Sequence, residues 1–177
     1  MKPDLDQWLP DDGLRVAYSR QSSASPDRLW TAARRVPLSD TGLLGRLVRW
    51  RIPGLRRSLT VDELFREPPF MILVEDEESM ISGLVGRIWT LRRDYPRLSG
   101  PDGFRAWDRR GTARVVFAHW VQATGDGSCL CTEVRIQPLG NRGRIGLAAV
   151  RPIVRRFGPL VGSEGLTAAV KAAERAR

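Results

Sequence analysis

The sequence predicts a single α+β domain in which a curved antiparallel sheet packs around a long C-terminal helix. Several segments between Leu14 and Pro138 alternate apolar and polar side chains and are separated by turns, as β-strands are. Residues 141–177 instead show the apolar spacing of an amphipathic helix. A length of 177 residues fits one domain that buries its own core. We expect residues 1–12 to form a flexible N-terminal segment and residues 13–177 to form the domain.

The net charge of +9 restricts the partners only weakly. Arginine supplies nearly all of the positive charge, because Lys2 and Lys171 are the only lysines. The arginines are spread along the chain rather than gathered in one block, so we expect no specific nucleic acid as partner. An arginine-rich surface that binds DNA or anionic membranes nevertheless stays open as a possibility.

The lack of a recognisable targeting signal and the spacing of the two cysteines favour a reducing compartment. The sequence has no basic segment followed by a long apolar stretch at its start and no uncharged apolar run of about 18 residues. We therefore expect a cytoplasmic protein without a transmembrane segment, either a monomer or a homodimer. Cys129 and Cys131 lie two apart on one face of a predicted strand, which favours a structural role over a disulfide. With a single histidine in the chain they do not complete a zinc site, so we expect no metal and no cofactor.

One strand followed by two short helices opens the domain. Residues 14–22 have the period-two alternation of a half-buried strand. Ser25-Pro26-Asp27 supplies an N-cap, a first-turn proline and an early carboxylate for the first helix. Ser39 or Asp40 is expected to cap the second helix, which Pro53-Gly54 ends.

A capping box and a hairpin follow. Thr60 and Glu63 match the capping-box pattern, which predicts one further helical turn. Apolar runs at residues 70–74 and 80–89 flank a charged turn and predict the hairpin. We interpret Gly83 and Gly86 in its second strand as a source of sheet curvature, in preference to contact with a ligand. Residues 91–111 then predict a loop that contains a small apolar helix.

A second and longer hairpin is predicted from residues 112–123 and 128–138, joined by Gly125-Asp126-Gly127. Alternation places one set of side chains on the inner, more apolar face. This set comprises Val115, Phe117, His119, Val121, Leu130, Thr132, Val134 and Ile136. On the outer face we expect Glu133 and Arg135 to be solvated or paired with Arg114.

His119 is the only imidazole of the chain. No carboxylate shares its predicted face to act as a partner in acid–base catalysis. We therefore favour a hydrogen-bonded histidine in the core or in a cavity wall, and keep a catalytic role as the alternative.

The closing segment from Asn141 carries apolar side chains at steps of four, namely Ile145, Ala149, Ile153, Phe157 and Val161. Pro152 and Gly158-Pro159 predict kinks, or a break between residues 158 and 162, and Ser163-Glu164 is positioned to cap a restart. We expect the arginines of this segment to be solvated.

Three stretches resemble the START-like helix-grip superfamily (SRPBCC, polyketide cyclase/dehydrase-like), in particular its uncharacterised bacterial members. Residues 84–89 resemble a "GxxGRxW" strand, and residues 104–117 resemble an "FxxFxxxGxAxxxxxF" passage in which Trp107 replaces a phenylalanine. Residues 132–135 resemble a "TETRV" strand, followed by a closing helix that ends with residues 163–166. The likeness extends from about Leu14 to Ala173.

The resemblance implies a START-like domain with six or seven strands around the long, kinked C-terminal helix and a hydrophobic cavity between them. It brings no catalytic residue set with it. Members of the superfamily mostly bind lipids, polyketides or other apolar small molecules, and some catalyse aromatic cyclisation or dehydration. The expected ligand-binding residues are Trp30, Trp89, Phe117, His119, Val121, Thr132, Val134, Ile136, Ile153 and Phe157. Among them, His119 or Thr132 is expected to orient one polar group of the ligand.

Two functional interpretations follow from this resemblance. The first is a protein that binds, and thereby transports or senses, an apolar small molecule or lipid. The alternative is a cyclase- or dehydratase-like enzyme that uses His119 as its acid or base. The sequence leans towards the first, because no catalytic constellation accompanies His119.

Overall fold

The computed structural model describes residues 1–175 apart from residues 53, 55, 57 and 91–93, and apart from the side chains of residues 51, 157 and 159–161. The elements that precede the first hairpin are β1 (Leu14–Ser22), α1 (Pro26–Arg35), the 3₁₀ helix η1 (Leu38–Thr41), α2 (Gly42–Arg51) and α3 (Val61–Arg66). They are followed by β2 (Met71–Glu75), β3 (Ser79–Gly86), α4 (Pro101–Arg105), β4 (Ala113–Thr124), β5 (Gly127–Pro138) and α5 (Gly140–Arg175).

The described strands form one antiparallel sheet in the order β1-β5-β4-β3-β2. It has five strands, so the expectation of six or seven was wrong. The described residues between β3 and β4 form α4 and irregular segments, because prolines and glycines interrupt the alternation that a further strand requires. The α+β class and the two hairpins are confirmed.

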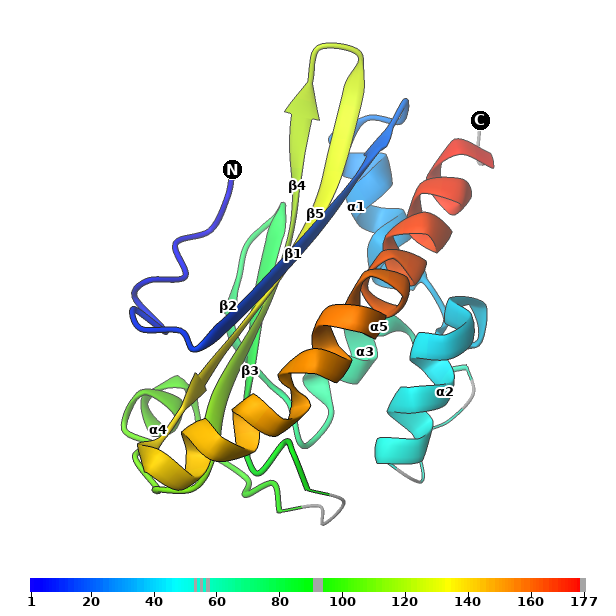
Figure 1. The fold of residues 1–177 in the computed structure, drawn as a ribbon. Coiled ribbons are helices and arrows are strands. Elements are labelled where there is room, and N and C mark those ends of the chain that lie inside the picture. The colour runs from blue at the N-terminus through cyan, green and yellow to red at the C-terminus, as the bar shows by residue number, and fades with distance from the viewer. Residues whose placement is uncertain (53, 55, 57, 91–93, 176–177) are drawn as a thin grey trace.

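The molecule has three layers (Figure 1). The helices α1, α2, α3 and α5 lie on one side of the sheet, and the N-terminal segment runs along the other side. The inner face of β4 and β5 carries the predicted residues, since Phe117, His119, Thr132 and Val134 all turn towards the helices. The alternation of the long hairpin therefore assigned both faces correctly.

The N-terminal segment, which we expected to be flexible, covers the outer face of the sheet. Leu5, Trp8 and Leu9 are buried there together with Phe104 and Trp120. Trp8 packs edge-on to Phe104, with a ring-centroid distance of 6.1 Å. Burial of these side chains shields the outer face from water.

This cover also encloses Glu133 and Arg135, which we had expected to be solvated or paired with Arg114. Both are buried, and Arg135 Nε donates to Glu133 Oε1 at 2.7 Å. Lys2 and Arg15 also contact Glu133, at 3.0 Å and 2.8 Å. The expectation was wrong because the segment that excludes water here is more than 100 residues away in the sequence. Arg114 instead donates to Gln137 across the hairpin.

The two glycines of β3 lie at positions where a side chain would clash or would strain the backbone. Gly83 makes room for Phe104, whose Cε2 atom would lie 2.8 Å from a Cβ at that position. Gly86 ends the strand with a φ of +143°, a conformation that favours glycine. The irregularity of the first hairpin lies in β2 instead, where the register shifts between Ile72 and Val74.

Helix α5 continues through Pro152 and Gly158-Pro159, so the predicted break near residues 158–162 is absent. The helix curves along the sheet instead (Figure 1). Pro152 is exposed, and water can therefore hydrogen-bond to the carbonyl that its missing N–H leaves free. Ser163-Glu164 does not start a new helix. Glu164 instead accepts hydrogen bonds from the backbone N–H groups of Leu43 and Leu44, at 3.1 Å and 2.8 Å.

Glu164 therefore caps the N-terminus of α2, the position for which we had expected Ser39 or Asp40. Those two residues lie in η1, which directly precedes α2. Their side chains bond to each other, with Ser39 Oγ donating to Asp40 at 3.0 Å. A carboxylate from α5 satisfies the free N–H groups in their place.

Candidate ligand cavity

A cavity of about 290 Å³ lies between the middle of the sheet and the helical layer. This volume is close to the lower end of the range of about 300–1,000 Å³ that is common for small-molecule sites. Strands β1, β3, β4 and β5 form one wall, and α1, α2, α3 and α5 form the other. The cavity therefore occupies the space between sheet and C-terminal helix in which a ligand was expected.

The wall is mostly apolar. Phe65, Phe70 and Phe117 pack against one another with ring-centroid distances of 5.1 to 5.5 Å. Val16, Met80, Leu130 and Val134 extend the wall along the strands, and Leu44 and Val48 contribute from α2. A ligand in this space would leave water mainly for apolar contacts.

Helix α5 contributes three glycines to the wall, Gly158, Gly162 and Gly165, together with Leu166. Tyr18 of β1 lies against the first two, and its Oη atom would be 2.7 Å from a Cβ at position 158. The glycines thus let β1 and α5 approach closely beside the cavity. The same three positions present backbone rather than large side chains to the space.

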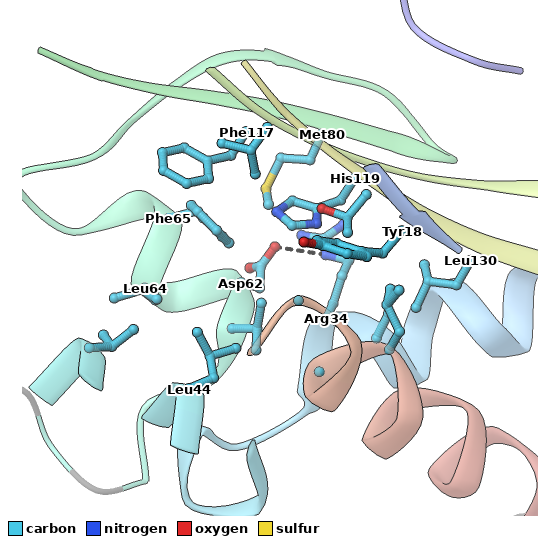
Figure 2. Close-up of a pocket in the computed structure, with 18 of the residues that line it drawn as sticks. Tyr18, Arg34, Leu44, Asp62, Leu64, Phe65, Met80, Phe117, His119 and Leu130 are labelled. Atoms are coloured by element: carbon cyan, nitrogen blue, oxygen red, sulfur yellow. Dashed lines mark hydrogen bonds and ion pairs between the residues drawn. The ribbon is translucent and has the colours of Figure 1, made fainter. Parts of the chain in front are cut away.

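His119 projects into the cavity from β4, as Figure 2 shows. Its ring centroid lies 4.8 Å from that of Phe65, and it faces Thr132 across the β4–β5 pair. Its Nε2 atom is buried and has no hydrogen-bond partner among the described residues. Burial lowers the pKa of His119 to about 4, so the imidazole is neutral near pH 7 and offers one donor and one acceptor.

Arg34 and Asp62 bring one ion pair to the cavity wall (Figure 2). Arg34 Nε lies 3.0 Å from Asp62 Oδ1, and Arg34 also contacts Glu75 at 3.1 Å. Burial alone would raise the pKa of Asp62, but hydrogen bonds and charges from Arg66 and Arg34 outweigh it and hold this pKa below its usual value. The carboxylate is therefore ionised and already compensated by arginine.

The structure brings five of the ten expected ligand-binding residues to the cavity wall, namely Trp30, Phe117, His119, Thr132 and Val134. Two others of the inner face, Val121 and Ile136, are buried beyond its ends. Val121 packs with Leu29 and the last turns of α5, and Ile136 packs with Leu14 and Leu147. The inner face of the hairpin is longer than the cavity, so both of its ends belong to the packed core.

Of the remaining three expected residues, Trp89 and Ile153 do not line the described cavity. Trp89 follows the end of β3, and its ring packs against Gly146 of α5. Ile153 is 60% exposed on the outer side of α5. The side chain of Phe157 lies outside the described part of the structure.

Several cavity residues were not identified from the sequence. Val16 and Tyr18 alternate correctly for the inner face of β1, and this signal would have sufficed to include them. Arg34, Asp62 and Phe65 come from α1 and α3, whose approach to the sheet depends on tertiary packing. Their sequence positions carry no comparable signal.

No group of three or more histidine, cysteine, aspartate or glutamate side chains among the described residues is arranged to hold a metal ion. Cys129 and Cys131 are free and buried, with their sulfur atoms 3.8 Å apart. Of the helices in the described ranges, none has the length and apolar character to cross a membrane.

Comparisons with known proteins return similarity to solved structures alone. No protein-family model matches the chain, and no curated protein matches it. The structure of protein NE0264 from Nitrosomonas europaea is 11% identical over 93% of this chain and 96% of its own, with a TM-score of 0.41. Ara h 8.0201 is 14% identical over 92% of this chain and 98% of its own, with a TM-score of 0.40. Protein MLL2253 from Mesorhizobium loti is 14% identical over 87% of this chain and 96% of its own, with a TM-score of 0.37.

These similarities are too low to assign a ligand or an activity to the chain. Its own architecture is a helix-grip-like α+β fold, in which a five-stranded antiparallel sheet curves around a C-terminal helix.

Proposed function

We propose that this protein binds an apolar small molecule or lipid in the cavity between the sheet and α5. The observation that carries the proposal is an apolar cavity in the middle of the sheet, where a packed core would otherwise continue. Apolar walls with a few polar groups are typical of small-molecule sites. Transport or sensing of the bound molecule would both use this site.

The polar groups of the wall favour a ligand that carries one neutral polar group. His119 and Thr132 lie opposite each other on neighbouring strands, and the unpartnered Nε2 atom of His119 would gain a hydrogen bond from a hydroxyl or carbonyl group. A ligand carboxylate next to His119 and Thr132 would lose its hydration without gaining an ion pair, because Arg34 is already paired with Asp62 and Glu75. The proposed ligand is therefore uncharged at this end.

The alternative function, a cyclase- or dehydratase-like enzyme, has His119 in the right place, since its ring lines the cavity. A pKa of about 4 makes this imidazole a weak base at neutral pH, however. The Asp62 carboxylate of the same wall is occupied by arginines. The geometry thus supports hydrogen bonding by His119 better than proton transfer.

The proposal is tested by binding of the neutral fluorescent probe N-phenyl-1-naphthylamine. Val16→Phe adds volume to the cavity wall, and we expect it to weaken probe binding roughly tenfold. Ala17→Phe is the matched control, because the neighbouring side chain is exposed on the opposite face of β1. Equal binding by the wild type and Val16→Phe would refute binding in this cavity.

Native mass spectrometry of the purified protein supplies a second readout. We expect a co-purified apolar molecule whose amount decreases in Val16→Phe and stays unchanged in Ala17→Phe. A bound molecule retained by both variants would place the binding site elsewhere.

A further inference from the structure

The exposed large hydrophobic side chains are gathered on two helices. Apart from Met1, those found among the described residues are Leu47 and Trp50 on α2 and Ile145 and Ile153 on α5. Trp50 is 63% exposed and Ile145 is 70% exposed. Such side chains are usually scattered over a protein surface, and clustering on neighbouring elements indicates an interaction site.

The two helices belong to the same layer. Glu164 of α5 bonds to the first turn of α2, and both helices border the cavity through Leu44, Val48 and Gly162. Their inner sides therefore point to the cavity, and their outer sides point away from the sheet (Figure 1). The exposed hydrophobic residues lie on this outer surface of the helical layer.

The region around α2 and the part of α5 that precedes Glu164 are rich in arginine and contain no acidic residue. Residues 41–61 carry five arginines, residues 141–163 carry five more, and neither range contains aspartate or glutamate. Outside these ranges some arginines pair with carboxylates, as Arg66 does with Asp62 and Arg87 does with Asp94. The ion pairs recorded for the described residues include none with Arg46, Arg144 or Arg156.

We propose that the outer surface of α2 and the first half of α5 docks on an anionic membrane. Arginines beside exposed tryptophan and isoleucine suit the boundary between phosphate headgroups and acyl chains, where the cations meet phosphate and the apolar side chains leave water. A nucleic acid would satisfy the arginines but would leave Leu47, Ile145 and Ile153 in water. The inference goes beyond ligand binding in the cavity, and it places the helical wall of that cavity against the phase in which apolar molecules reside.

The first test is flotation with vesicles of phosphatidylcholine that contain about one-third phosphatidylglycerol. We expect the full-length protein to bind them near 25 mM salt and to dissociate near 500 mM salt, since salt screens the arginines at roughly these concentrations. Pure phosphatidylcholine vesicles should bind far less protein. Absence of binding to the anionic vesicles at low salt would overturn the proposal.

Two double variants separate the contributions of charge and apolar insertion. Arg46→Gln/Arg156→Gln should weaken vesicle binding roughly tenfold or more, and Trp50→Ala/Ile153→Ser should weaken it by a similar factor. Arg20→Gln/Arg35→Gln removes two exposed arginines outside this surface and serves as the charge-matched control. An equal loss in the control would show that net charge alone causes binding, and would overturn the docking surface.

Insertion of Trp50 into the bilayer is measured separately from the affinity of the protein for vesicles. Trp50→Phe keeps an aromatic side chain, so this variant should still bind while losing part of the fluorescence quenching by acyl-brominated phosphatidylcholine. Unchanged quenching would show that Trp50 stays outside the bilayer and would overturn the proposal. Tight binding to duplex DNA that Trp50→Ala/Ile153→Ser retains, without vesicle binding, would assign the arginines to a nucleic acid instead.

These outcomes are independent of the cavity. The naphthylamine probe binds in solution without vesicles, so a protein that fails to bind it and still floats with anionic vesicles refutes cavity binding alone. Circular dichroism and thermal unfolding confirm that each surface variant is folded, as expected for exposed side chains.

Discussion

Tyr18 of β1 lies so close to Gly162 of α5 that a Cβ atom on this glycine would overlap the ring atoms Cδ2 and Cε2. Gly146 has the same relationship with Trp89. The long helix is therefore held against the molecule at two places where an aromatic ring meets bare backbone. Glycine lowers the intrinsic stability of a helix, and close packing offsets this cost.

Gly162→Ala should destabilise the protein, although alanine is the better helix former. We expect the free energy of unfolding to fall by about 1 to 3 kcal/mol, because the added methyl group must displace the Tyr18 ring or the helix. Gly165→Ala is the control in the same helix, since its nearest neighbour, Leu44 Cδ2, would lie 3.9 Å from the new Cβ. Urea denaturation should show a gain of up to about 1 kcal/mol for the control. A stabilised Gly162→Ala would contradict the close approach.

Glu164→Ala should destabilise α2, the neighbouring helix. It removes the carboxylate that accepts from the N–H groups of Leu43 and Leu44, and we expect a loss of about 1 kcal/mol. Glu77→Ala removes an equal charge from the exposed turn of the first hairpin and should leave the unfolding free energy nearly unchanged. Thermal unfolding of the two variants compares them directly. Equal midpoints would show that water caps α2 as well as Glu164 does.

Glu133→Gln should lower stability in a way that depends on pH. Burial opposes ionisation of Glu133, but hydrogen bonds from Arg135, Lys2 and Arg15 outweigh it and hold its pKa below the usual value. A carboxylate with a lowered pKa stabilises the fold above the unfolded pKa of about 4.3 and loses this contribution as the pH falls through the folded pKa. The wild type should therefore exceed the variant by about 1 to 3 kcal/mol near pH 7.

Urea denaturation at a series of pH values checks this prediction. The difference between wild type and Glu133→Gln should shrink as the pH falls below about 4. A difference that stays constant from neutral to acidic pH would show that Glu133 is not ionised in the folded protein. Arg135 also lowers the pKa of Asp6, which is present in both proteins. Both should therefore lose some stability as the pH falls, in addition to the difference caused by Glu133.

The titration of His119 can be followed without ambiguity, because the chain has no other histidine. We expect its ring resonances in the NMR spectrum of untagged protein to titrate with a pKa of about 4, compared with about 6.5 when unfolded. The neutral form is the one that the fold accepts, so stability is complete above the unfolded pKa and falls between about pH 6.5 and pH 4. A midpoint near 6.5 would show that the ring is solvated and would remove it from the cavity wall.

Much of the sheet could be predicted because β-strand alternation is local. The side chains of β4 and β5 reveal their face by parity alone, and this placed Phe117, His119 and Thr132 on the inner side correctly. Parity did not reveal where along the strands the cavity ends, which is why Val121 and Ile136 were included and Val16 was omitted. The extent of the cavity depends on which helix residues fill the space above each strand position.

The outer face shows the limit of the same reasoning. Glu133 and Arg135 were expected to be solvated or paired with Arg114, because nothing near them in the sequence predicts a segment that excludes water from them. The N-terminal segment supplies that cover through Trp8 and through the ion pairs of Lys2 and Asp6. The apolar residues Leu5, Trp8 and Leu9 have helical spacing over a single turn, which gives no local signal of the surface against which the segment will pack.

The sequence by itself determined the α+β class, the two hairpins, the presence of the closing helix and the position of the single histidine on the inner face of β4. Each of these rests on propensity and periodicity, which act between residues close in the chain. The sequence did not determine the buried side of the closing helix, because Ile145, Ala149 and Ile153 of the predicted apolar stripe are exposed. The tertiary structure alone decided that α5 continues through its prolines, that Glu164 caps α2 and that Arg34 and Asp62 reach the cavity. These features depend on contacts between distant segments, whose free energies become available only when the layers have packed together.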